Sequence, residues 1–185
     1  MKENAGFKSI CTLFIITAAM ALLLAVVNGI TAERIALSKE EKTEAALSAV
    51  MPEGAVLEEQ LETYPDETGL VTAAYQTSHG YVFQISTGGY GGEITMTVGV
   101  DSNLAVSGVE IVSHSETPAL GEKAAKGAVG EAFRGQFVGL SGILAVVKDG
   151  GTVEALTGAT VTSRAVTKGV SAALACAAAL EGGNP

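Results

Sequence analysis

From Ser9 to Ala32 the chain carries no charged side chain, and most residues in this run are apolar. A helix of about 20 apolar residues crosses the hydrocarbon core of a bilayer, at a rise of about 1.5 Å per residue. The run therefore predicts a transmembrane anchor which, with the short polar stub before it, covers residues 1–32. A cleaved signal peptide, with an apolar core of about 7–15 residues, and a buried soluble helix are the alternatives.

Basic side chains on either side of the run bear on its orientation. Lys2 and Lys8 precede it, and positive residues favour the cytoplasmic side of a membrane. Arg34, Lys39 and Lys42 follow the run and dilute this signal. A short stub, one span and a large domain usually place the domain outside. We expect a single-pass protein of the cell (inner) membrane with its C-terminal domain on the extracytoplasmic side.

Charge and cysteine content exclude several classes of function. The net charge is −9, so a nucleic-acid partner is not expected. Cys11 and Cys176 form no CxxC pair, and His79 and His114 are too few and too scattered to predict a metal site. Any redox chemistry in this chain would therefore need an organic cofactor.

Residues 33–54 predict a polar juxtamembrane helix. Ser38 and Glu41 have the spacing of a capping box, and helix-forming residues follow. Pro52 and Gly54 predict the end of this helix. The remaining residues, 55–185, then form the globular domain.

The first half of this domain has the pattern of β-strands. Residues 71–76 and 81–86 flank a short turn at 78–80, as in a hairpin. Residues 93–100 alternate between apolar and polar side chains, which indicates a strand with one buried face. A further strand is predicted over residues 104–112.

The second half mixes helices and strands. We expect a helix over residues 120–137, a hairpin of strands 143–147 and 152–156, and a helix over 161–180. Strands joined as hairpins pair antiparallel. The predicted fold class is α+β, with a mostly antiparallel sheet and packed helices behind one N-terminal transmembrane helix.

The segment 154–163 joins a predicted strand end to a helix start through small residues. The amino end of a helix presents unpaired amides and a positive dipole end, which suits a phosphate. Ser and Thr are also the usual helix caps, so an ordinary N-cap is the competing interpretation. The hydroxyl-bearing residues of this segment are Thr157, Thr160, Thr162 and Ser163.

Residues 157–160 resemble the [S/T]-G-A-T flavinylation motif of the FMN-binding domain family. That family includes the G subunit of the Rnf electron-transport complex and the C subunit of the sodium-pumping NADH:quinone reductase. The resemblance implies that Thr160 carries FMN through a phosphoester bond made by a flavin transferase. Where the family often has Asp six residues earlier, this chain has Glu154.

Two more segments carry the resemblance. Residues 89–94 are similar to the family's glycine-rich strand entry, and residues 114–121 to its E-T-P-G-L-G element. Ala119 stands in place of the glycine there, and alanine disfavours the positive φ that glycine permits. The chain length resembles that of the Rnf G subunit more than that of the longer quinone reductase C subunit.

The resemblance implies a cofactor site and no independent catalytic residue or metal. Glu116, Thr117 and Leu120 would approach the flavin from a second loop. Tyr90 would either stack on the ring or fill the core, and Lys148 would either pair with the phosphate or face solvent. The residues expected around the phosphate are Thr157, Gly158, Ala159, Thr160, Val161 and Thr162.

The implied function is electron relay in a membrane-bound Rnf-type ferredoxin:NAD oxidoreductase complex that supports ion translocation. Its partners would be the membrane, iron–sulfur and flavin subunits of that complex. A component of a quinone reductase or a stand-alone outer-face flavoprotein is one alternative. A non-redox membrane-anchored structural protein, in which the threonine-rich turn is only a helix cap, is the other.

Overall fold

The chain divides into two compact units, Met1–Glu41 and Lys42–Pro185. The structure, a computed structural model, describes residues 3–182. Helix α1 (Glu3–Val50) makes up the described part of the first unit and contributes its last residues to the second. The described part of the first unit is therefore a helix alone, and the second unit holds the sheet.

Helix α1 exposes its apolar side chains within the first unit. Phe14 is 71% exposed and Leu22 is 70% exposed. Of the helices within residues 3–182, α1 is the one long and apolar enough to cross a membrane. A helix that is apolar all round and covered by no protein suits a lipid environment.

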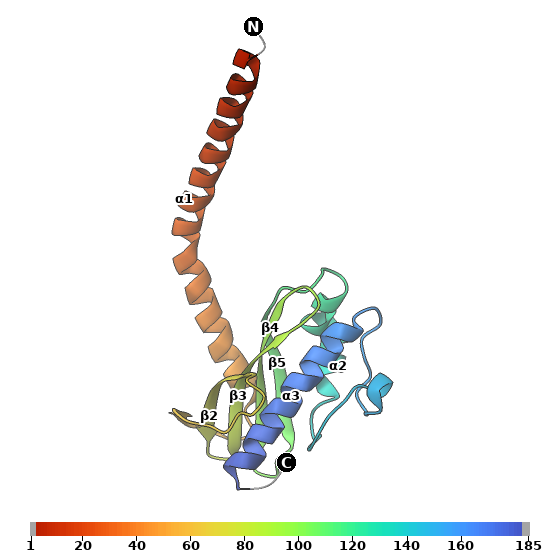
Figure 1. Ribbon diagram of the computed structural model, residues 1–185. Coiled ribbons are helices and arrows are strands. Elements are labelled where there is room, and N and C mark those ends of the chain that lie inside the picture. The colour runs from red at the N-terminus through yellow and green to blue at the C-terminus, as the bar shows by residue number, and fades with distance from the viewer. Residues whose placement is uncertain (1–2, 183–185) are drawn as a thin grey trace. The chain divides into compact units, whose positions relative to one another are not determined.

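The second unit is built on one five-stranded antiparallel sheet whose spatial order follows the sequence. Each strand pairs with the next strand in the sequence, so every connection within the sheet joins two neighbouring antiparallel strands (Figure 1). This confirms the predicted α+β class. The strands are β1 (Leu57–Leu61), β2 (Val71–Thr77), β3 (Gly80–Gly88), β4 (Glu93–Asp101) and β5 (Val106–His114).

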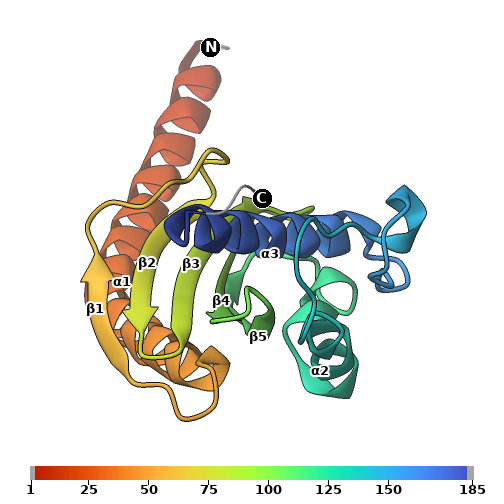
Figure 2. The same ribbon diagram turned by 90° about the horizontal axis from the view of Figure 1, so that it is seen from below.

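Helix α3 (Thr160–Leu180) covers one face of the sheet, crossing β2, β3 and β4 (Figure 2). Gly169 allows this close approach, because a Cβ there would lie 2.2 Å from the Met96 methyl and 2.9 Å from Ile85. The core between the helix and the sheet is apolar. Its fully buried members include Phe83, Ile85, Ile94, Met96, Val98, Val166, Val170 and Ala173.

The last turn of α1 packs on the sheet residues of β4 and β5. Val50 is buried, and the Ser107 hydroxyl donates a 2.6 Å hydrogen bond to the Val50 carbonyl oxygen. Gly99 and Gly108 leave room for this turn, since a Cβ at Gly99 would lie 1.9 Å from that oxygen. The end of α1 is thus fixed to the domain by packing as well as by the chain.

The helix expected over residues 120–137 is shorter and interrupted. A 3-10 turn, η1 (Gly121–Ala124), precedes helix α2 (Gly127–Gly135). Gly127 has a φ of +65°, which no continuous α-helix contains. Phe133 and Phe137 lie edge to face with ring centroids 5.5 Å apart, and both are buried.

The hairpin predicted from 143–147 and 152–156 was wrong. These residues form one parallel bridge, between Val146 and Val153, around the 3-10 turn η2 (Val147–Asp149). The Ser171 hydroxyl of α3 accepts from the Leu144 amide and donates to the Leu144 carbonyl. These bonds hold the segment on the helix, where a paired strand cannot form.

Candidate functional site

A cavity of about 450 Å³ opens at the amino end of α3. Small-molecule sites usually enclose about 300–1,000 Å³, so this cavity has the size for a nucleotide-like ligand. Four segments meet there: the turn at 89–92, the loop at 116–121, η2 and the start of α3. The lining residues are Tyr90, Glu116, Thr117, Leu120, Gly121, Lys148, Gly158, Ala159, Thr160, Val161 and Thr162.

A tight turn presents the first residues of α3 to the cavity. Gly158 has a φ of +79°, and the Ala159 amide donates to the Leu156 carbonyl at 3.0 Å. The Ser163 hydroxyl accepts from the Leu156 amide and donates to the Ala159 carbonyl, which holds the turn from behind. The first three helical amides, those of Thr160, Val161 and Thr162, lack acceptors within the helix.

The electrostatics of this helix start favour an anion. The first turn of α3 carries no acidic residue, so the positive end of the helix dipole is uncompensated within that turn. The Lys148 ammonium lies 3.3 Å from the Thr160 hydroxyl oxygen and donates to it. Lys148 therefore reaches the cavity instead of facing solvent alone. A phosphate bound at Thr160 would meet both an ammonium and backbone amides.

An ion pair holds the Lys148 turn against α3. The Arg164 guanidinium donates two hydrogen bonds of 2.6 Å to the two carboxylate oxygens of Asp149. These hydrogen bonds from Arg164 lower the pKa of the Asp149 carboxyl below its usual value. Gly151 completes the turn, since a Cβ there would lie 1.9 Å from the Ala145 carbonyl oxygen. The adjacent Lys148 is thereby placed beside the first turn of the helix.

Glu116 lies in the cavity wall with its carboxylate engaged by protein groups. Its Oε1 accepts from the amides of Tyr90 at 2.7 Å and Gly91 at 3.2 Å. Its Oε2 accepts from the Thr162 hydroxyl at 2.6 Å. Both Glu116 and Thr162 are buried. The Thr162 hydroxyl is directed to Glu116, so Thr162 offers a ligand its backbone amide.

The loop before η1 forms the opposite rim. Ala119 has a φ of +62°, so alanine adopts the left-handed conformation that its side chain disfavours. The Leu120 amide donates to the Thr117 carbonyl at 3.2 Å, and the Ala119 amide to a Glu122 carboxylate oxygen at 3.3 Å. This turn leaves Leu120 44% exposed at the cavity.

Tyr90 stands at the mouth of the cavity. Its side chain is 73% exposed, so it does not fill the core. Its turn is closed by the Gly89 amide, which donates to the Gly92 carbonyl at 2.7 Å. A free aromatic face at a cavity rim can stack on a planar ligand.

Nine of the ten expected cofactor residues thus line one cavity. The exception is Thr157, which lines a separate hollow beside Phe133 and Gln136. Glu154 is exposed, and its backbone is held by the Gln136 side chain, which donates to its carbonyl and accepts from its amide. Gly121 also lines the cavity but was not predicted to do so. Its position directly after Leu120 in the 114–121 segment could have indicated it.

The remaining cysteine and histidine candidates lie outside this cavity. Cys176 is buried in the core, where burial raises the pKa of its thiol to about 11. His114 ends β5, and its Nδ1 accepts from the Glu116 amide at 3.3 Å. Across the described residues, no group of three or more His, Cys, Asp or Glu side chains could hold a metal ion.

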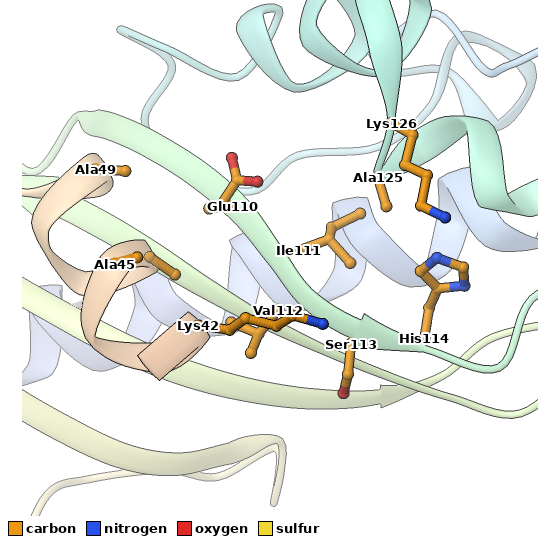
Figure 3. A pocket seen from close by; sticks show the side chains of 11 residues that line it. Lys42, Ala45, Ala49, Glu110, Ile111, Val112, Ser113, His114, Ala125 and Lys126 are labelled. Carbon is orange, nitrogen blue, oxygen red and sulfur yellow. The ribbon is translucent and has the colours of Figure 1, made fainter. Parts of the chain in front are cut away.

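A larger hollow of about 650 Å³ lies along β5 (Figure 3). Lys126 and His114 approach one end of it, and Ala45 and Ala49 line the other side. It shares no residue with the cavity at α3. Lys126 is paired with Glu122 at 2.6 Å, so its charge is already compensated.

Residues 89–175 match the family model described as FMN-binding domain. The G subunit of an ion-translocating oxidoreductase complex from Stutzerimonas stutzeri is 32% identical, over 94% of this chain and 81% of its own length. The G subunit of the same description from Methanosarcina acetivorans is 30% identical, over 95% of this chain and 96% of its own. The G subunit of a proton-translocating ferredoxin:NAD(+) oxidoreductase complex from Clostridium ljungdahlii is 44% identical, over 56% of each chain.

These matches confirm the resemblance inferred from the motifs. They support FMN as the cofactor and a role in electron transfer within a multi-subunit oxidoreductase complex. The apolar helix α1 and this complex membership indicate a membrane-associated protein. The chain therefore belongs to the FMN-binding domain family, within the group of G subunits of Rnf-type ion-translocating oxidoreductase complexes.

Proposed function

We propose that this chain carries one FMN as a phosphoester on Thr160 and relays electrons through it. The observation that carries the proposal is the half-buried Thr160 hydroxyl, which lies in the wall of the 450 Å³ cavity and 3.3 Å from the Lys148 ammonium. FMN supplies reversible electron transfer, and the protein supplies its place and its surroundings. The chain needs no acid, base or nucleophile pair for this role.

Each wall of the cavity has a task in this proposal. The amides of Val161 and Thr162 and the Lys148 ammonium would hold the phosphate, as helix amino ends and lysines do elsewhere. Leu120 and the Tyr90 ring would flank the flavin ring from the two rims. Gly158 and Ala159, having little or no side chain, leave space for the phosphate beside the backbone.

The ester requires a separate maturation enzyme. A flavin transferase would join the Thr160 oxygen to the phosphorus of an activated flavin nucleotide, displacing the rest of that nucleotide as the leaving group. The hydroxyl proton is lost, and the chain gains one FMN moiety. Lys148, which already donates to the Thr160 oxygen, would stabilise the charge of the phosphate that arrives there.

Mass spectrometry and gel fluorescence test the ester directly. The full chain is produced with and without a flavin transferase and then denatured. Wild type made with the transferase should fluoresce in the gel and gain the mass of one FMN moiety, and Thr160→Ala should do neither. Thr152→Ala is the matched control, because Thr152 is an exposed threonine outside the 157–160 motif and does not line the cavity, and it should keep the flavin. Wild type that stays unmodified beside an active transferase would refute the proposal.

We also propose that α1 crosses the membrane once and places the domain outside. There, electrons would pass between this flavin and the iron–sulfur and flavin subunits of a ferredoxin:NAD oxidoreductase that couples transfer to ion movement. The support is the N-terminal position of the apolar helix and the names of the relatives. A tether suits that side, since no cytoplasmic pool could replace a lost flavin.

Thiol labelling of intact cells tests the orientation. Glu58→Cys puts an exposed thiol on strand β1, while the native Cys176 is buried and has a raised pKa. A membrane-impermeant maleimide should label the variant in intact cells as fully as in lysed cells. Labelling that appears only after lysis would place the domain in the cytoplasm.

A further inference from the structure

The carboxylate of Glu116 joins three segments of the cavity wall. It accepts two backbone hydrogen bonds from the 89–92 turn and one hydroxyl hydrogen bond from α3, while its own backbone lies in the loop before η1. Glu116 is buried, with 7% of its surface exposed. A buried carboxylate held this way fixes the positions of the groups that donate to it.

The surrounding glycines are shaped around this carboxylate. A Cβ at Gly89 would lie 2.0 Å from Glu116 Oε1, and a Cβ at Gly121 would lie 2.2 Å from Oε2. The Gly121 Cβ would also lie 2.7 Å from the Thr162 hydroxyl oxygen. A side chain at either position would displace the carboxylate. The two glycines therefore keep the Glu116 carboxylate in the position where it accepts these hydrogen bonds.

The charge of Glu116 has no cationic partner among the ion pairs of the described residues. The Lys148 ammonium, the other charged group of the cavity wall, donates to Thr160. A charge in a cavity wall that is partly shielded from water interacts more strongly with a neighbouring charge than it would in bulk solvent. A carboxylate there opposes the arrival of an electron on a flavin in the cavity.

Resting on the proposed FMN site, we propose that Glu116 is a positioning residue with two effects on the flavin. Its hydrogen bonds hold the Tyr90 turn at the cavity rim whether or not flavin is bound. Its negative charge makes the bound flavin harder to reduce. Glu116 thus acts on the flavin indirectly, through the position of the Tyr90 turn and through the electrostatic field of its carboxylate. The carboxylate oxygens themselves are hydrogen-bonded to protein donors.

Glu116→Gln separates these two effects. Glutamine keeps the shape and can still accept from the Tyr90 and Gly91 amides, and its amide can donate to the Thr162 hydroxyl oxygen. The charge alone is lost. The midpoint potential of the attached flavin, measured by spectroelectrochemical titration of the full chain, should become more positive. Glu58→Gln on the distant edge strand β1 removes the same charge and should leave the potential unchanged.

Amide exchange tests the turn without any flavin. In unmodified full-length chain bearing Thr160→Ala, the added change Glu116→Ala should speed exchange at Tyr90 and Gly91 about tenfold or more, as loss of a charged acceptor predicts. Glu116→Gln should leave it near the parent rate. Protection at Phe83 in the core reports that each variant is folded.

The outcomes separate this inference from the FMN ester itself. Absence of flavin from the wild type refutes the ester, while the exchange experiment still decides the role of Glu116 in the turn. With flavin attached, an unchanged or more negative potential in Glu116→Gln overturns the electrostatic effect. Equal exchange at Tyr90 in parent and Glu116→Ala overturns the positioning effect.

Discussion

The hydrogen bond between Thr162 and Glu116 should contribute measurably to the stability of the domain. It is 2.6 Å long, buried, and made to a carboxylate. Thr162→Val keeps the shape of the side chain but replaces the donor hydroxyl with a methyl group. Hydrogen bonds to charged groups contribute about 1.5–3 kcal/mol, and a buried acceptor left without its donor keeps its desolvation cost.

We therefore expect Thr162→Val to lower the free energy of unfolding by about 2–3 kcal/mol. In a domain of this size each kcal/mol lowers the midpoint temperature by about 2–4 °C, so the shift should be about 4–12 °C. Thr162→Ser, which keeps the hydroxyl, should recover most of the loss.

Thr167 supplies the matched control on the same helix. It is equally buried, and its hydroxyl donates at 2.8 Å to the Ser163 carbonyl, which the helix ladder can also satisfy. Thr167→Val should cost less than about 1 kcal/mol. Urea unfolding of unmodified protein, followed by circular dichroism, measures both variants. Equal losses for the two valines would refute the reasoning that the carboxylate makes the Thr162 bond special.

Three further predictions concern the loop before η1 and the core. Ala119→Gly should raise the free energy of unfolding by about 0.5–1 kcal/mol, seen as a higher urea midpoint, because it relieves a positive φ but loosens the unfolded chain. Gly121→Ala should lower both the urea midpoint and the fluorescent flavin yield, since its Cβ would meet Glu116, and normal values of both would contradict the clash. Native Cys176 should resist iodoacetamide at pH 8 and react after unfolding, because its thiol, with a pKa of about 11, stays protonated there; rapid native alkylation would argue otherwise.

The antiparallel strands could be predicted from sequence because their signals are local. Period-two alternation marked β4, and a short turn between apolar runs marked β2 and β3. Strand β1 was not predicted, since its side chains are mostly exposed and leave no alternating apolar pattern. The segment at 143–156 has strand-like composition, but tertiary bonds from Ser171 to Leu144 decide its shape.

The candidate site was predictable as a set of residues but not as a geometry. Two separate motifs, at 157–160 and 114–121, identified Thr160 and Glu116 through resemblance. Neither motif indicated that Glu116 and Thr162, 46 residues apart in the sequence, are in contact. Ala119 adopts the glycine-like φ because the turn around it is held by Thr117 and Glu122. Such contacts depend on the whole fold, which no local pattern encodes.

The sheet has two edge strands, and β1 is one of them. It is short, its register with β2 shifts between Leu57 and Glu59, and it exposes the carboxylates of Glu58 and Glu59. An irregular, acidic edge repels another strand that could extend the sheet. Copies of this domain, concentrated on a membrane, are thereby protected against edge-to-edge aggregation.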